Sequence, residues 1–399
     1  MQVLLIDYKN DSRSENRGNG DYEESRKVEQ KITNNYILNM KRLVISFVLV
    51  VSIIIGSYGQ TNKPIGKQLH VTYSHPKTVL NASNPDAKDI VFGFEGGRVV
   101  KVNGTYHLFT SEMYQPPMWV KMRFGHWIST DKLSWKRVST IRESSGEFEG
   151  LDPRAALWSP LPVWDADNNE WNLFYVAYKA KANTPEKFLW NHEGRIWRSV
   201  SEVKGKNGIN GPFVDKGIVM EPGSESQAWE GLQGTDSFFP YKVGKTWYAF
   251  YGSAKTEIKP ILHWLVGQAS APSLEGKWIR SDSNPSKIEK KGIENPIVTP
   301  AFKKGWLMVY DQVVVDGAFG WCYSEDGINW PAGNATPIDT SKNAWCADVR
   351  TPLGLVDEGN GKYTLFYTGF EQKPDYDIIF SGAKTDNYCS MGFIELEWK

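Results

Sequence analysis

The stretch GKYTLFYTG at residues 361–369 is an aromatic and β-branched run between two glycines, and the run recurs along the chain. The other copies are GTYHLFTS at 104–111, EWNLFY at 170–175, KTWYAFYGS at 245–253 and GWLMVY at 305–310. Measured between their first aromatic residues, neighbouring copies lie 65, 76, 59 and 57 residues apart. Further strand-like runs flank the copies, and three or four strands recurring roughly every 60 residues are typical of a β-propeller. We therefore expect an all-β fold, a five-bladed β-propeller whose innermost strands line a central funnel.

A secretory signal is predicted ahead of these repeats. The basic start MKR at 40–42 precedes an apolar run at 43–56, and small residues follow. This order is typical of a signal peptide, and the run is short for a membrane span, although a membrane anchor is the alternative. We therefore divide the chain into a non-translated or disordered extension at 1–39, a signal peptide at 40–59 and the propeller domain at 60–399. The mature protein is expected to be periplasmic or extracellular, without stable membrane insertion after signal cleavage.

The composition excludes some partners and favours others. Lys plus Arg equals Asp plus Glu at 46 each, so the basic surface that nucleic-acid binding requires is not expected. The chain has 17 Trp, 18 Tyr and 18 Phe, and aromatic rings either stack on sugar faces or fill β-sheet cores. An oligosaccharide or polysaccharide partner is therefore one interpretation, and the sequence does not indicate an oligomeric state.

No cofactor or metal site is indicated by the cysteines and histidines. Cys322, Cys346 and Cys389 form no C-x-x-C pair, and the six histidines lack the spacing of a metal-binding motif. We therefore expect no cofactor and no catalytic metal. The sequence does not exclude a structural calcium ion at the floor of the funnel.

Three acids share one position relative to the recurring aromatic residue. Glu95 and Asp236 each precede it by 11 residues, and Glu294 precedes it by 12. The second repeat has Ser159 at this position, and the fifth has Asp348 and Arg350 nearby. Because the blades of a propeller are related by rotation, we expect these positions to converge at one end of the funnel.

Converging carboxylates suit the hydrolysis of a glycosidic bond. Mutual repulsion and burial raise the pKa of one acid, which can then protonate the leaving oxygen while another carboxylate stays ionised. The candidate stacking platforms for the sugar are Trp119, Trp158, Trp229 and Trp345. Arg154 and Arg350 are candidates to bind its hydroxyls or an anionic group. In the alternative interpretation the acids form structural ion pairs with arginines or hold a cation.

The motifs resemble those of the five-bladed propeller glycoside hydrolases, namely family 43 and its relatives, families 32, 62, 68 and 117. The segment WSP at 158–160 is similar to the Trp-Ala-Pro of family 43, TDSFF at 235–239 to its Ile-Asp-Pro-Ser, and IENP at 293–296 to its Glu-Gly-Pro. The similarity covers residues 90–370, and its weight lies in the order of the motifs and their placement on successive blades.

The resemblance implies a role for each acid. Family 43 enzymes invert at the anomeric carbon, with an Asp base in blade 1, an orienting Asp in blade 3 and a Glu acid in blade 4. Carried over, Glu294 is the general acid and Asp236 the orienting carboxylate. Blade 1 departs from the pattern, because Glu95 stands one residue earlier than the expected Asp, and Asp152 and Asp348 are the alternative bases.

The family 117 pattern is not met at one position. That family has a His just before the blade-4 Glu, whereas this chain has Ile293, so its chemistry is not carried over. The expected function is a secreted glycoside hydrolase that removes terminal arabinofuranosyl, xylosyl, galactosyl or related sugars from plant or algal oligosaccharides or polysaccharides. A non-catalytic glycan-binding propeller and a polysaccharide lyase are the alternatives.

Overall fold

The computed structural model describes residues 68–261, 264–289, 292–311, 318–333, 338–339, 345–383 and 385–399. The predicted extension at 1–39 and the predicted signal peptide at 40–59 lie outside these residues. The chain divides after Gly66, and the unit described below is Lys67–Lys399. Within the described ranges, no helix is both long enough and apolar enough to cross a bilayer.

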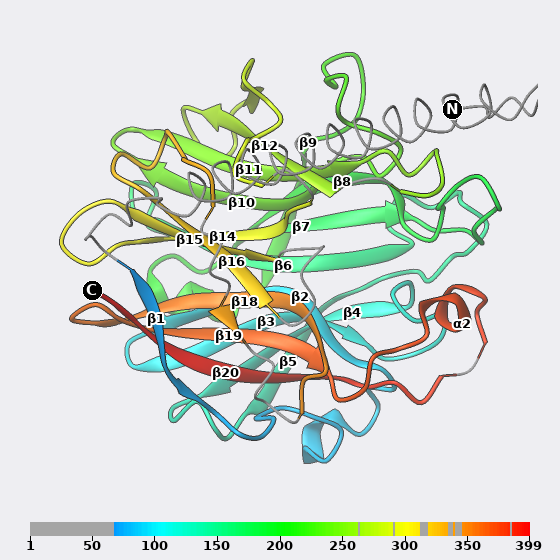
Figure 1. Cartoon of the computed structure of the whole chain (residues 1–399), viewed down its shortest axis with the longest axis horizontal. Helices are drawn as coiled ribbons and strands as arrows, with labels where there is room; N and C mark the ends of the chain where they lie inside the picture. Colours follow the sequence, from blue (N-terminus) through cyan, green and yellow to red (C-terminus); the bar gives the residue numbers. More distant parts are fainter. Residues whose placement is uncertain are drawn as a thin grey trace, which may run out of the picture. The chain divides into compact units, whose positions relative to one another are not determined.

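The described chain is built almost entirely of antiparallel β-strands, which confirms the prediction of an all-β fold (Figure 1). Its helical segments are short: the 3-10 helices η1 (Pro85–Ala87) and η2 (Lys206–Asn210), and the α-helix α2 (Tyr376–Phe380).

Three sheets contain four strands each, in chain order. One consists of β6 (Ala156–Asp165), β7 (Glu170–Lys179), β8 (His192–Ser201) and β9 (Phe213–Met220). Another consists of β10 (Asp236–Val243), β11 (Thr246–Ala254), β12 (Trp264–Ala271) and β13 (Ile279–Arg280). The third consists of β14 (Glu294–Pro300), β15 (Trp306–Asp311), β16 (Ala318–Ser324) and β17 (Ile338–Asp339).

The fourth sheet has eight strands and joins the two ends of the unit. One half is β2 (Gly93–Val102), β3 (Thr105–Met113), β4 (Met122–Ser129) and β5 (Lys136–Glu143). The other half is β18 (Asp348–Gly359), β19 (Lys362–Phe370), β20 (Cys389–Trp398) and the first strand, β1 (Leu69–Ser74). The halves meet at one parallel pair, Gly93 with Cys389, where a Cβ on Gly93 would lie 2.0 Å from the Cys389 carbonyl oxygen.

The first strands of the successive four-stranded runs contact one another in order. β2 contacts β6, β6 contacts β10, β10 contacts β14, β14 contacts β18, and β18 contacts β2. These contacts bring residues from all parts of the unit toward one region, although the hydrogen-bonded sheets of the described chain do not close on themselves.

The recurring aromatic residue has the same place in each run, at the start of the second strand. It is Tyr106 in β3, Trp171 in β7, Trp247 in β11, Trp306 in β15 and Tyr363 in β19.

Asn-Gly turns connect the first and second strands in two of the runs. Asn103 and Gly104 between β2 and β3 have φ of 49° and 84°, and Asn360 and Gly361 between β18 and β19 have φ of 55° and 78°. Two positive φ angles are what a two-residue type I′ hairpin requires, and Asn-Gly is the sequence that accommodates them best.

The core lies between the faces of neighbouring sheets and is rich in aromatic side chains. Phe124 of β4 contacts Tyr175 of β7, and Phe174 of β7 contacts Phe238 of β10, with ring centroids 5.3 Å apart in both pairs. Cys322, Cys346 and Cys389 are free and buried. Many of the aromatic side chains therefore fill the core between the sheets, which was one of the two interpretations of the aromatic composition.

Candidate functional site

The three predicted acids lie beside irregularities of the strands that carry them. Glu95 is the third residue of β2, while Asp236 and Glu294 begin β10 and β14. In each case the pairing with the next strand shifts register directly after the acid, as a β-bulge produces. The following residues, Gly96, Ser237 and Asn295, all have positive φ, at 70°, 47° and 49°. Bulges of this kind turn a side chain away from the regular pleat, and they are frequent next to active sites.

The fourth equivalent position belongs to Trp158 and not to Ser159. β6 shifts register after Trp158, and Ser159 is the residue with positive φ, at 54°. Ser159 therefore corresponds to Gly96, and its Oγ would lie 2.7 Å from a Cβ on that glycine. The expectation that Ser159 takes the place of the acids in the second repeat is wrong by one residue, because the turn between β6 and β7 is two residues longer than the turn between β2 and β3.

The three acids line one cavity of about 310 Å³. Two further predicted site residues, Trp158 and Arg350, line it as well. The remaining lining comes from Trp119, Ser159, Tyr178, Phe188, Asn191, Gln233, Ile261, Trp264, Asn295, Thr351, Tyr376 and Phe380. The convergence expected from the repeat is therefore observed in the geometry of the described chain.

Glu95 enters the cavity as half of an ion pair. Its Oε1 accepts hydrogen bonds from Nε and Nη2 of Arg350 at 2.9 and 2.6 Å, and its Oε2 accepts one from Nε1 of Trp119 at 2.6 Å. Arg350 also donates to the hydroxyl of Tyr376 at 3.2 Å. These bonds fix the orientation of the Glu95 carboxylate at the wall of the cavity.

Asp236 and Glu294 occupy a different environment. Burial raises the pKa of Glu294 well above its usual range, and the nearby carboxylates of Asp236 and Asp311 raise it further. Burial also raises the pKa of Asp236, while hydrogen bonds from the Tyr178 hydroxyl and the Ser237 backbone N–H oppose that rise. The cavity thus combines an ion-paired carboxylate with an acid that tends to keep its proton, which is the division that acid–base chemistry requires.

Two predicted site residues do not line the cavity. Arg154 forms an ion pair with Asp215 at 2.8 Å and lies over the ring of Trp197, 3.8 Å from its centroid. The side chain of Arg154 therefore binds residues of β8 and β9 and does not reach the cavity. Asp348 is buried behind the cavity wall and accepts a hydrogen bond from the Tyr376 hydroxyl at 2.5 Å.

The alternative base Asp152 is also absent from the cavity lining. Its Oδ1 accepts a hydrogen bond from the backbone N–H of Arg154 at 2.8 Å, an arrangement that stabilises a turn. Of the three candidate bases, Glu95 is the one whose side chain reaches the cavity.

Trp119, one of the predicted stacking platforms, comes from the loop between β3 and β4 and lines the cavity. Three further lining residues had no recognisable signal in the sequence, namely Tyr178 at the end of β7 and Tyr376 and Phe380 of α2. The rings of Trp119 and Tyr376 are stacked, with centroids 6.0 Å apart. Aromatic side chains therefore line the cavity in direct contact with its carboxylates, as Trp119 does with Glu95.

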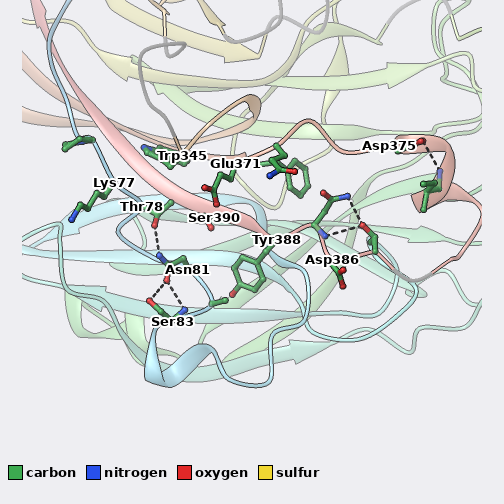
Figure 2. Close-up of a pocket in the computed structure, with 17 residues that line it drawn as sticks. Lys77, Thr78, Asn81, Ser83, Trp345, Glu371, Asp375, Asp386, Tyr388 and Ser390 are labelled. Carbon is green, nitrogen blue, oxygen red and sulfur yellow. Dashed lines mark hydrogen bonds between the residues drawn. The ribbon is translucent and has the colours of Figure 1, made fainter.

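A second hollow of about 1010 Å³ lies on another side of α2 (Figure 2). Asp375 and Ile378 of the α2 region face it, whereas Tyr376 and Phe380 face the carboxylate cavity. Lys77, Asn81 and other residues surround this hollow, together with Trp345, one of the predicted stacking platforms.

Clusters of three or more His, Cys, Asp or Glu side chains arranged to hold a metal ion are absent from the described ranges.

Comparison with known proteins identifies the class of fold. A family 117 glycoside hydrolase produced by the marine bacterium Zobellia galactanivorans is similar, with a TM-score of 0.56 and 14% identity over 84% of this chain and 91% of that one. An α-L-arabinofuranosidase from Podospora anserina, solved in complex with cellotriose, has a TM-score of 0.50 and 13% identity over 82% of this chain and 97% of that one. A family 43 enzyme from Xanthomonas citri has a TM-score of 0.48 and 10% identity over 81% and 90%.

The fold is that of the propeller glycoside hydrolases, so the resemblance drawn from the short motifs is confirmed at the level of fold. No protein-family model and no curated protein sequence matches the chain.

Proposed function

We propose that the protein is a secreted glycoside hydrolase of the family 43 kind, which removes terminal sugars by acid–base catalysis with carboxylates. The observation that carries this proposal is the meeting of Glu95, Asp236 and Glu294 at one cavity. The fold of the propeller glycoside hydrolases supports the same conclusion.

The proposed reaction assigns one step to each acid. Glu294, whose pKa burial raises, donates its proton to the glycosidic oxygen as the bond from that oxygen to the anomeric carbon breaks. A water molecule adds to the anomeric carbon, and its proton passes to Glu95, the base of this scheme. Asp236 orients the sugar and the acid, and its charge helps Glu294 keep its proton until the leaving group is in place.

The size and lining of the cavity support a small terminal sugar as the bound group. Its volume of about 310 Å³ is at the lower end of ligand sites, which span roughly 300–1,000 Å³. Trp158 and Trp119 offer rings on which a sugar face can stack. Arabinofuranosyl, xylosyl and galactosyl linkages of plant or algal glycans are the proposed substrates, and the segment at 40–59 is the proposed export signal.

We assign five blades to the fold as part of this proposal. Three are the four-stranded sheets, and two are the halves of the eight-stranded sheet, β2–β5 and β18-β19-β20-β1. The order of contacts among β2, β6, β10, β14 and β18 supports this count.

The test is release of sugar from a panel of aryl-glycosides and plant and algal oligosaccharides by the purified protein and by Glu294→Gln. We expect the variant to lose activity by about 10²–10⁴-fold, the usual contribution of a general acid, while still binding the sugar. Glu325→Gln, a change at an exposed glutamate paired with Lys304, is the matched control.

Three other outcomes would contradict the proposal. A Glu294→Gln variant as active as the wild type would remove the acid from the mechanism. Binding without release by the wild type would indicate a glycan-binding protein, and an ultraviolet-absorbing unsaturated product would indicate a lyase.

A further inference from the structure

Asp311 lies directly across the strand pair from the proposed general acid. It is the last residue of β15, and its partner in the antiparallel register is Glu294, the first residue of β14. Directly opposed residues of antiparallel strands project to the same side of the sheet, with Cβ atoms roughly 4.5–5.5 Å apart. The two carboxylates are therefore neighbours by construction of the sheet.

A charged residue at this position is peculiar to one of the runs. The equivalent residue of each second strand stands five residues after the recurring aromatic residue, as Asp311 does after Trp306. It is Ser111 opposite Glu95, Val176 opposite Trp158, Gly252 opposite Asp236, and Thr368 in β19. Only the run that carries the proposed acid places a second carboxylate there, among the described strands.

The charges around the pair come from several strands. Asp311 interacts with Arg350 and Asp348 of β18 and with Glu95 of β2, and burial raises its pKa to about 7 while Arg350 opposes that rise. Glu294 faces the same Arg350 and Glu95, and also Asp236 of β10. The Tyr178 hydroxyl of β7 interacts electrostatically with Glu294 and Asp236. The Tyr376 hydroxyl interacts in the same way with Arg350 and Asp348.

We infer that Asp311 is a positioning residue of the proposed hydrolysis, which acts through its charge to hold the proton on Glu294 and so sets the alkaline limit of activity. The inference rests on the proposed function. Asp311 is absent from the lining of the cavity, so its effect is exerted on Glu294 and not on the sugar.

The expected effect has a definite sign. An ionised Asp311 disfavours the ionised form of Glu294, so removing its charge makes Glu294 lose its proton at lower pH. In Asp311→Asn, the alkaline limb of kcat/KM should move toward lower pH by about one unit, a tenfold change in proton affinity. Activity at the acidic side of the optimum should change little, because Glu294 is protonated there in both proteins.

The experiment compares pH profiles of kcat/KM for the wild type, Asp311→Asn and the matched control Asp282→Asn. Asp282 is exposed in the segment after β13, and its substitution should leave the profile unchanged. If Asp311→Asn does not fold, Asp311→Ser takes its place, since serine is the residue of β3 at the equivalent position.

Titration of the Glu294 carboxyl, followed by NMR with ¹³C-labelled glutamate and assigned with Glu294→Gln, provides a readout that needs no activity. It separates failure of this inference from failure of the proposed function, because it can be measured in a protein that hydrolyses no tested glycoside. A Glu294 that titrates at the same pH with and without the Asp311 charge would overturn the inference. A shift toward lower pH would support it.

Discussion

Replacing Arg350 by methionine tests the ion pair at the wall of the cavity. The guanidinium donates two hydrogen bonds, at 2.9 and 2.6 Å, to a carboxylate oxygen of Glu95. The side chain of Glu95 is 2% exposed, and that of Arg350 is 28% exposed. The variant therefore leaves a carboxylate that is almost fully buried without its cation.

The cost can be worked from these exposures. Breaking a fully buried ion pair by removing one partner costs about 3–5 kcal/mol, and the partial exposure of Arg350 lowers our expectation to about 2–3 kcal/mol. With an unfolding entropy of about 2.1 cal/mol/K per residue over the roughly 330 residues of the unit, this loss lowers Tm by about 3–4 °C.

The assay is a double-mutant cycle of the wild type, Arg350→Met, Glu95→Gln and the double variant, measured by calorimetry and urea unfolding at neutral pH. The double variant should be more stable than Arg350→Met, because glutamine leaves no uncompensated charge and can still accept the hydrogen bond from Trp119. We expect a coupling energy of about 2 kcal/mol. A double variant whose loss equals the sum of the two single losses would refute the reasoning.

Three further predictions concern the same cavity. Since the folded-state pKa of Glu294 is raised, the stability that the neutral acid provides is present below its unfolded pKa and lost as pH rises through its folded pKa. As pH rises from about 5 into the alkaline range, Tm should therefore fall less in Glu294→Gln than in the wild type, and parallel curves would contradict this. Gly96→Ala should cost about 1–2 kcal/mol in urea unfolding, because Gly96 has φ of 70° and the new Cβ would lie 2.7 Å from Ser159 Oγ; an unchanged midpoint would speak against it. Trp119→Phe removes a hydrogen bond to the buried Glu95 carboxylate and should cost about 1.5–3 kcal/mol, so a variant with wild-type stability would show that this bond contributes nothing.

The strand-based fold was predictable because its signals are local. The Asn-Gly pairs at Asn103 and Asn360 mark hairpins through their own backbone preferences. The recurring aromatic residue marks the second strand of each run by sequence alone. Spacing from that residue also located the acids at Glu95, Asp236 and Glu294, since each of these strands runs for seven or eight residues from the acid to its end.

The rest of the site depends on contacts that are remote in sequence. Trp119 and Tyr376 reach the cavity from connecting segments, where no repeat applies. Arg154 was expected at the site because a guanidinium can bind sugar hydroxyls or an anionic group, but its partner Asp215 lies on β9, far along the chain. Asp311 was not predicted, because only the first strands of the repeats carry the spacing signal. Its place opposite Glu294 follows from the register between the first and second strands.

The placement of β1 makes the two ends of the folded unit direct neighbours. Leu69 pairs with Trp398, and the backbones of Gln68 and Lys399 exchange hydrogen bonds of 2.6 and 3.1 Å. A short peptide bridge can therefore join these ends, and a new start can be opened at the exposed Asn103-Gly104 turn without removing any strand. Such a circular permutant keeps the cavity intact, whereas deleting β1 uncovers the edge of β20 and invites pairing with another chain.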